Sequence, residues 1–394
     1  MKQTMPLGRV AGIRIGAHWS ALVMVVLIGW LLGAQVLPGL APHEPAVAYW
    51  AVAVPGAVTF IAALLAHELA HSLVARRYGV PVTSITLWAL GGVSELGGEP
   101  PHARADLLIA AAGPGTSLAA GLVFGGIAVV VRAGGGPVIA VAALGWLAVM
   151  NVFLAVFNLL PGAPLDGGRI LRAALWLRHG DRARATRTAA TAGRVLGAVL
   201  IAAGAAELLL WGDAGGLWLA VIGMFVMSAA TAEATAGSAT AALAGLRVGD
   251  IMTPDPDIGA TWLTVSDFID RVTLDPAQTE FPVIGPGGSL AGVTGVRRLA
   301  RVPPASRNIT TLQQVITAVP PAYVASPEDP AAPLLSRPPL SGDLAAIVVT
   351  GGRIAGIVTV TRLRQIVRRE ALRAHPRPAT VSRWARTGRP PAWY

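Results

Sequence analysis

The sequence predicts a polytopic α-helical membrane protein with six spans, followed by a soluble α/β region. Of its 394 residues, 54% are hydrophobic and 13% are charged, a composition that is too apolar for one soluble domain. After residue 240 the long apolar runs stop and short strand-like segments begin. We therefore expect a membrane domain at 1–240, an α/β domain at 247–373 and a basic, disordered tail at 374–394.

Six apolar runs meet the length of about 20 residues that a bilayer demands. They cover residues 19–39, 47–75, 104–132, 138–160, 192–211 and 216–235. The first run has a basic start like a signal peptide, but it is too long and lacks a small-residue cleavage site, so we expect a retained span. Arginines flank the spans instead of forming one basic face, so the net charge of +10 indicates cytoplasmic loops and not nucleic-acid binding. With six spans, the basic segments all fall on one side, and the N-terminus and C-terminal region are cytoplasmic.

The second apolar run carries the pattern H-E-x-x-H at His67, Glu68 and His71. Two histidines four residues apart lie on one helical face, so both imidazoles can bind the same zinc ion. Glu68 lies on the same side and can take a proton from water, as in zinc peptidases. Ionisable residues inside an apolar span are costly, which makes packed structural histidines a poor alternative. The chain has no cysteine, so thiolate ligands and cysteine nucleophiles are excluded.

A catalytic zinc ion needs a third protein ligand, and Asp166 is the strongest candidate. Two prolines precede Asp166 and two glycines follow it, a pattern that presents a carboxylate on an irregular segment. The structural alternative is that Asp166 caps a helix over residues 169–176. Other carboxylates are weaker candidates because of their positions along the chain: Glu95, Glu99 and Glu207.

Two further features could contact a substrate. Asn158, at the end of the fourth span, could donate a hydrogen bond to an oxyanion or a peptide backbone, or it could simply end the helix. Residues 80–98 read as a β-hairpin turning near Gly91 and Gly92, with an ordinary loop as the alternative. We expect residues 83–90 to offer a strand edge to an extended substrate. The Gly-Pro-Gly at 113–115 is interpreted as a packing kink.

The combination of H-E-L-A-H in a span with N-L-L-P-G-A-P-L-D-G about ninety residues later resembles the site-2 protease family of intramembrane zinc metalloproteases. The resemblance implies one zinc ion per chain, bound by His67, His71 and Asp166, with Glu68 as the base. It implies that Asn158 contacts the substrate or oxyanion. It also implies that the hairpin at Gly91 and Gly92 is a membrane re-entrant loop that binds the substrate.

The C-terminal region resembles the paired CBS motifs found in one subgroup of that family. Its faint internal repeat predicts helices at 265–272 and 312–318, and strands at 281–284, 290–293, 345–349 and 354–359. The resemblance implies homodimers formed through this region and an adenine nucleotide ligand. The usual Gly-x-x-Thr-x-x-Asp pattern is altered, however. The second copy keeps Thr359 but has Arg362 at the Asp position, and the first copy has Gly295 and Arg298 at the Thr and Asp positions.

The predicted function is zinc-dependent endoproteolysis of single-span membrane proteins within or near their transmembrane segment, in a bacterial inner or plasma membrane. The resemblance implies regulated intramembrane proteolysis, with an anti-sigma factor or signalling protein as substrate. One alternative is a CBS-regulated channel or transporter whose histidines and glutamate line an ion path. A permeation path does not need H-E-x-x-H together with a distant aspartate. A second alternative is a catalytically dead adaptor, but every expected catalytic residue is present.

Overall fold

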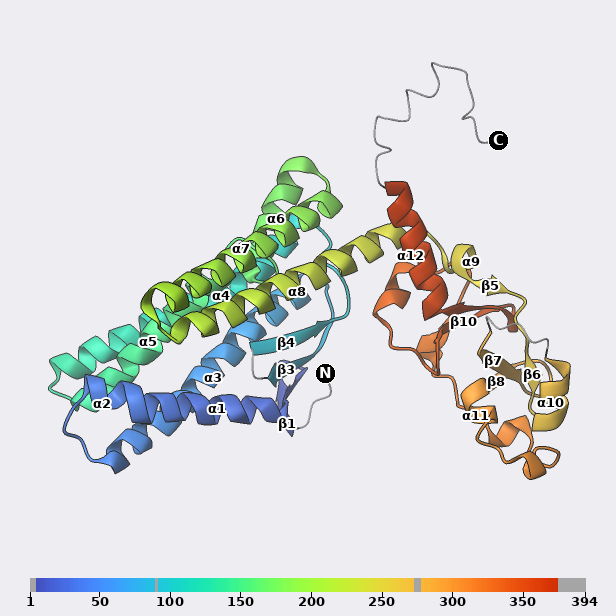
Figure 1. Cartoon of the computed structure of the whole chain (residues 1–394), viewed down its shortest axis with the longest axis horizontal. Coiled ribbons are helices and arrows are strands. Elements are labelled where there is room, and N and C mark those ends of the chain that lie inside the picture. The colour runs from blue at the N-terminus through green and yellow to red at the C-terminus, as the bar shows by residue number, and fades with distance from the viewer. Residues whose placement is uncertain (1–4, 89–90, 273–277, 375–394) are drawn as a thin grey trace, which may run out of the picture. The chain divides into compact units, whose positions relative to one another are not determined.

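The computed structural model describes residues 5–88, 91–272 and 278–374. The chain divides into two compact units, Met1–Thr235 and Ala236–Tyr394. Within the described residues, six helices are long and apolar enough to cross a membrane, and the second unit is α/β, so the expected fold class is confirmed (Figure 1). The predicted tail at 374–394 lies outside the described residues except for Ala374, the last residue of a helix.

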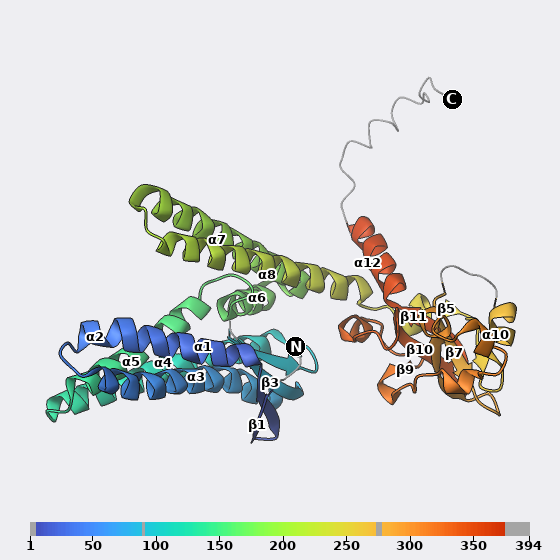
Figure 2. The same cartoon turned by 60° about the horizontal axis from the view of Figure 1, so that its bottom comes forward.

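The long helices match the expected spans closely. Their bounds are α1 (Trp19–Leu31), extended by a π-helical turn (Leu32–Val36) and α2 (Leu37–Leu40), then α3 (Ala46–Arg77), α4 (Ala103–Ala133), α5 (Val138–Asn158), α7 (Arg182–Trp211) and α8 (Gly215–Leu243). Large apolar side chains such as Leu122, Val130 and Leu209 are exposed on these helices, as expected for surfaces that face lipid. Figure 2 shows α7 and α8 running side by side as a hairpin.

The basic segment between the fourth and fifth spans is more helical than expected. A short helix, α6 (Asp166–His179), ends at Gly180 in the left-handed conformation. The next helix, α7, begins at Arg182, ten residues before the predicted start at 192. Asp181 caps α7 by accepting a hydrogen bond from the Arg184 backbone N–H at 2.9 Å. Arginine and alanine are strong helix formers, which explains why both basic runs are helical.

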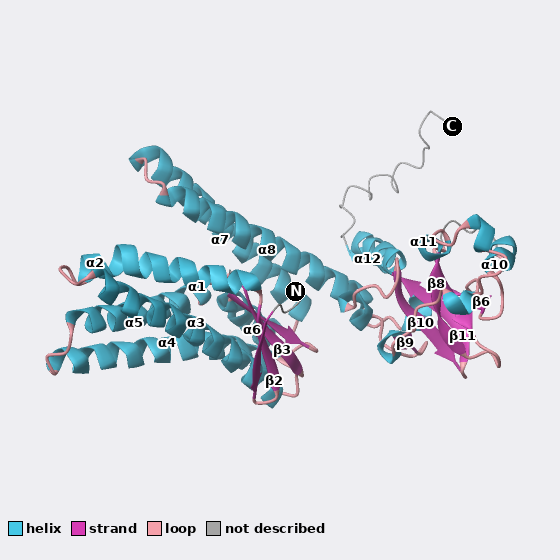
Figure 3. Cartoon of the chain, turned by 90° about the horizontal axis from the view of Figure 1, so that it is seen from below, coloured by secondary structure: helices cyan, strands magenta, loops and turns pink. Residues whose placement is uncertain are grey.

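A four-stranded sheet lies at one end of the helices, in the order β1 (Met5–Val10), β2 (Ile13–Ala17), β3 (Val82–Trp88) and β4 (Gly91–Leu96) (Figure 3). The N-terminal hairpin was not predicted, although Ala11 and Gly12 have the positive φ angles of a tight turn. Strand β2 pairs with β3 in parallel, with Ile15 opposite Ile85. Arg76 at the end of α3 donates a hydrogen bond to the Ala11 carbonyl and so ties the hairpin to the helix.

The prediction that residues 83–90 provide a free strand edge is wrong where the structure describes them. Strand β3 is paired on both sides, in parallel with β2 and antiparallel with β4. The two edges among the described strands of this sheet are β1 and β4, and β4 is the edge strand that contacts Glu68. The error arose because the pairing partner β2 was not recognised in the sequence. Residues 89 and 90, at the tip of the hairpin, lie outside the described part.

The second unit contains two similar α/β motifs. The first has α9 (Val248–Ile251), β5 (Thr253–Pro254), β6 (Gly259–Ala260), α10 (Val265–Arg271), β7 (Glu280–Ile284), β8 (Leu290–Gly295) and α11 (Val296–Leu299). The second has β9 (Val324–Ala325), β10 (Leu344–Thr350), β11 (Arg353–Thr359) and α12 (Val360–Ala374). The strands form two sheets, in the orders β6-β7-β8 and β5-β11-β10-β9.

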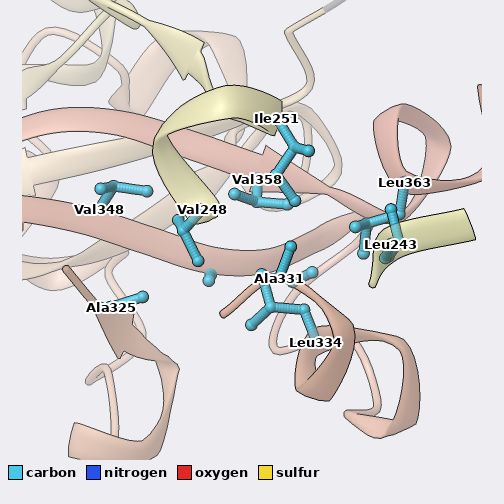
Figure 4. Close-up of a cluster of buried hydrophobic side chains, with 11 residues drawn as sticks. Leu243, Val248, Ile251, Ala325, Ala331, Leu334, Val348, Val358 and Leu363 are labelled. Atoms are coloured by element: carbon cyan, nitrogen blue, oxygen red, sulfur yellow. The ribbon is translucent and has the colours of Figure 1, made fainter. Parts of the chain in front are cut away.

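One apolar core joins the start of this unit to its end. Val248 and Ile251 of α9 pack with Val358 of β11 and Leu363 of α12, close to Leu243 (Figure 4). The expected helix at 312–318 is wrong: only a 3-10 turn, Leu312–Gln314, forms there. The chain then extends, because Thr317 exchanges two backbone hydrogen bonds with Val293 of β8.

Candidate metal centre

Helix α3 brings His67 and His71 together because residues four apart lie one turn apart on the same face. Their rings are 4.8 Å apart between centroids, and their Nε2 atoms are separated by 3.1 Å. Both side chains are buried, with 2% and 7% of the residue surface exposed. The predicted pair is therefore aligned inside the helical unit and directed at a common point.

Asp166, the first residue of α6, completes the cluster. Its Oδ2 atom lies 3.2 Å from His67 Nε2 and 3.1 Å from His71 Nε2. The residue that caps α6 is Leu165, so the alternative role of Asp166 as a helix cap does not describe its position. Gly167 is required for this approach, because a Cβ atom there would lie 2.2 Å from the Leu160 carbonyl oxygen.

The chemistry of these three groups fits a zinc ion. Ligands at about 2.1 Å in a tetrahedron are about 3.4 Å apart, close to the separations seen here. The Nδ1 atom of His71 lies 2.6 Å from the Ile109 carbonyl oxygen, which can only accept, so Nδ1 carries the proton. In its neutral form, His71 therefore presents a lone pair at Nε2. Lone pairs and a carboxylate that converge at this distance are complementary to a cation.

Helix α4 supplies the groups that orient both imidazoles, and the sequence interpretation missed them. Besides Ile109, Ser117 lies 2.9 Å from His67 Nδ1 through its Oγ atom. A Cβ atom at Gly113 would lie 2.2 Å from His71 Nε2, so this glycine makes room for the two imidazoles. The first glycine of Gly-Pro-Gly therefore has a role in packing beside the histidines. The small residues at 113, 117 and 121, four apart within a span, were the available signal.

Glu68 faces strand β4. Ser94 of β4 donates a hydrogen bond to Glu68 Oε2 at 3.4 Å, and the Ser94 hydroxyl is 3.2 Å from that of Ser72. A Cβ atom at Gly92 would lie 2.3 Å from Glu68 Cγ, so only glycine lets the strand approach this closely. Gly91, in contrast, has a φ of 135° and open space where a Cβ atom would be. The expected base and the hairpin are thus neighbours.

The remaining candidates lie in different surroundings. Asn158 donates from Nδ2 to the Leu154 carbonyl oxygen of its own helix at 3.0 Å, as a residue ending a helix would. Glu99 forms an ion pair with Arg182. Glu207 lies beside Gly215, at the turn between α7 and α8. The side chain of Glu95 is outside the described part of the structure. Among the described His, Cys, Asp and Glu side chains, the one cluster suited to a metal ion is His67, His71 and Asp166.

Comparisons with known proteins identify the family to which the chain is similar. The model of peptidase family M50 matches residues 55–135 and 135–203, which include the three candidate ligands and Glu68. The chain is 45% identical over 368 residues to Rip3 of Mycobacterium tuberculosis, whose name describes a zinc metalloprotease, with 93% of each chain covered. It is also similar to the solved site-2 protease of Methanocaldococcus jannaschii, at 29% identity and a TM-score of 0.40, covering 58% of this chain and 94% of that one. The CBS domains of a transcriptional regulator from Streptococcus pneumoniae match 31% of this chain and 98% of their own, at 20% identity and a TM-score of 0.26. Because the similarity to Rip3 extends over nearly the whole length of both chains, this chain belongs to peptidase family M50, the site-2 protease family of intramembrane zinc metalloproteases.

Proposed function

We propose that this protease cleaves single-span membrane proteins within or near their transmembrane segment, using one zinc ion held by His67, His71 and Asp166. The observation that carries the proposal is the convergence of three potential ligand atoms from α3 and α6, beside a glutamate that contacts the edge strand β4. A membrane-bound anti-sigma factor or signalling protein is the substrate class that fits a regulatory protease. The zinc ion supplies Lewis acidity, which acidifies water and polarises a carbonyl group.

Glu68 acts as the general base and then as the general acid. Its carboxylate takes a proton from the attacking water as the new C–O bond forms, and gives a proton to the amide nitrogen as the C–N bond breaks. The Ser94 hydroxyl, 3.4 Å from Oε2, fixes which way the carboxylate points. Asn158 remains a candidate for contacting the substrate backbone, and it must exchange its hydrogen bond with Leu154 to do so.

The direct test is Glu68→Gln, which keeps the shape of the side chain and removes the base. We expect cleavage of a single-span substrate to fall by at least about 100-fold, in line with the usual contribution of general base catalysis. Zinc content by elemental analysis should stay at one ion per chain. Wild-type turnover by purified Glu68→Gln protein would refute this mechanism.

The edge of β4 provides a place for the substrate. A helical peptide hides its carbonyl groups, so the scissile segment must unwind, and its unpaired backbone groups are costly at membrane depth. Pairing with β4 satisfies them and presents the peptide next to Glu68, which β4 already contacts through Gly92 and Ser94. In this arrangement Gly91 and Gly92 bind the substrate through their backbone groups, and their lack of side chains leaves space for it.

Strand pairing predicts a period of two along the substrate. In a strand, successive N–H groups point to opposite sides, so only alternate amides of the substrate can bond to β4. We expect N-methylation of single amides near the scissile bond to block cleavage at every second position. Uniform inhibition along the segment would contradict pairing with β4 and leave the metal assignment intact.

The orientation that we propose places the N-terminus and the second unit in the cytoplasm. Pairing of β2 with β3 supports an even number of crossings between them, because the strands flank the first two spans. The chain has no cysteine, so single cysteines report the topology cleanly. In intact cells an impermeant thiol reagent should label Gly135→Cys, in the turn after α4, and leave Asp250→Cys unlabelled. Labelling of Asp250→Cys would reverse the assignment.

In the second unit, we propose that an adenine nucleotide binds to the second motif. Gly295 of the first motif faces the Glu280 carboxylate, which occupies the space where a side chain at 295 would lie. Thr359 of the second motif accepts a hydrogen bond from the Arg362 N–H at 3.1 Å and marks the start of α12. Calorimetry with ATP should show one site per chain that is lost in Thr359→Val and kept in Thr361→Val. Equal binding by both variants would place the nucleotide elsewhere.

A further inference from the structure

A buried ion cluster joins α6 to α4 next to the metal ligands. Asp106 in the first turn of α4 has no exposed surface. Arg172 of α6 donates two hydrogen bonds to it, from Nε to Oδ2 at 2.9 Å and from Nη2 to Oδ1 at 2.8 Å. Arg169 lies 3.6 Å from Oδ1 and Glu233 of α8 lies 3.4 Å from Arg172 Nη1. Neither the peptidase chemistry nor the metal coordination described above uses these charges.

The cluster fixes the helix that carries the third ligand. Arg169 and Arg172 follow Asp166 by three and six residues on the same 14-residue helix. Asp166 itself is the first residue of α6, and an irregular segment at 159–165 precedes it. The two-pronged contact between Arg172 and Asp106 restricts the rotation of this helix about its axis, since a planar guanidinium binds a carboxylate in one plane.

The contacts described above from Asp106, Ile109 and Ser117 come from one face of α4. Asp106, Ile109, Gly113 and Ser117 are spaced by three, four and four residues, so they form one stripe along the helix. Ile109 orients His71, Ser117 orients His67, and Asp106 holds α6. Distances between points on a regular helix are fixed at about 1.5 Å per residue. A single rigid element therefore sets the separation between the two histidines and the aspartate.

We infer that Asp106 and Arg172 are positioning residues for the metal site, holding Asp166 at the distance from His67 and His71 that zinc requires. The inference rests on the proposed assignment of Asp166 as a ligand. A purely structural role is the competing explanation. A buried ion pair is a poor source of stability, because apolar residues of similar size often stabilise a protein as well or better. An apolar pair cannot provide the directional contact between the guanidinium and the carboxylate. Replacing the ion pair by an apolar pair therefore distinguishes a positioning role from a purely structural one.

The experiment measures zinc release and thermal unfolding of the full-length protein in detergent micelles. Asp106→Asn removes the charge, Arg172→Lys keeps the charge without the planar fork, and the double variant Asp106→Leu/Arg172→Met replaces the pair by apolar packing. Zinc release to a chelator should be about 10- to 100-fold faster in all three, the usual effect of losing an outer contact of a metal site. Glu99→Gln, which breaks the surface ion pair with Arg182, is the matched control and should release zinc at the wild-type rate.

Thermal unfolding distinguishes positioning from stability. The apolar double variant should unfold at or above the wild-type temperature and still release zinc quickly, with kcat lowered more than KM is changed. Wild-type zinc retention in this double variant would overturn the inference, because packing alone would then suffice. Should Asp106→Asn fail to fold, Arg172→Lys and the double variant still decide the question. Zinc retention by Asp166→Ala would instead show that the ligand assignment is at fault.

Discussion

Asp166 and Asp106 are both buried carboxylates that join α6 to a neighbouring helix, yet their partners differ in kind. Asp106 faces guanidinium donors, so its charge and its hydrogen bonds are satisfied within the protein. Asp166 faces two imidazole nitrogens, and in a neutral His71 ring the facing nitrogen is an acceptor because the other nitrogen donates to Ile109. The charges of the first site are balanced within the protein, whereas the second is complementary to a cation. The type of partner, more than burial, therefore separates a structural carboxylate from a metal ligand.

Removing the carboxylate of Asp166 should give the largest effect. Asp166→Ala deletes a ligand, so zinc affinity should fall by more than the 10- to 100-fold typical of outer contacts, and cleavage should fall to background. Elemental analysis after dialysis measures zinc per chain. Asp106→Ala should retain more zinc than Asp166→Ala, and the reverse order would break the distinction between the two carboxylates.

Adding one carbon atom at Gly113 should be nearly as damaging. The new Cβ atom in Gly113→Ala would lie 2.2 Å from His71 Nε2 and 2.5 Å from His67 Nε2, so at least one imidazole must move. Zinc content and cleavage should both fall by at least about 10-fold, because catalytic geometry tolerates little displacement. Gly115→Ala is the matched control, since its Cβ atom would meet nothing within 4 Å.

Removing the Ser117 hydroxyl should have a smaller effect. Ser117→Ala leaves His67 Nδ1 without its partner and loosens the ring, so zinc should be released about 10-fold faster. Thr116→Ala removes a neighbouring hydroxyl that bonds to the Ala112 carbonyl of its own helix, and it should leave zinc release unchanged. Equal rates for the two variants would show that α4 orients His67 by packing alone.

Replacing a third buried carboxylate, Glu280 in the second unit, should have the smallest effect, and it should change stability alone. Burial raises the pKa of Glu280, against the opposing influence of a Ser341 hydrogen bond, Arg298 and Arg297. A raised pKa in the folded state means that folding favours the proton, so stability is lost as pH rises through that pKa. Thermal unfolding followed between pH 5 and 8 should show wild-type stability falling with pH. The stability of the Glu280→Gln variant should depend less on pH and should exceed that of the wild type at pH 8. The stability of Asp270→Asn, a change at an exposed residue, should depend on pH as the wild type does.

The clustering of His67, His71 and Asp166 could be predicted because its signals are local. One helical turn fixes the relation between His67 and His71, and proline and glycine around Asp166 mark an irregular segment. The contacts of Ser117 and the ion pair of Asp106 with Arg172 could not be predicted, since they depend on how α4 is rotated against α3 and α6. The free edge of the sheet was misassigned for a similar reason. Which side of β3 is covered depends on β2, seventy residues away, and no local pattern encodes that pairing.

The parallel pairing of β2 with β3 has a consequence for the order of events during synthesis. Ile15 and its partner Ile85 are separated by 70 positions, since 85 minus 15 is 70. At a synthesis rate of about 5–20 residues per second, the partner emerges roughly 4–14 seconds later. The two strands flank the first two spans, so β2 must stay on the side of the bilayer where β3 will arrive. The N-terminal sheet, with β4 at its other end, can therefore close only on a chain in which both strands lie on the same side of the bilayer.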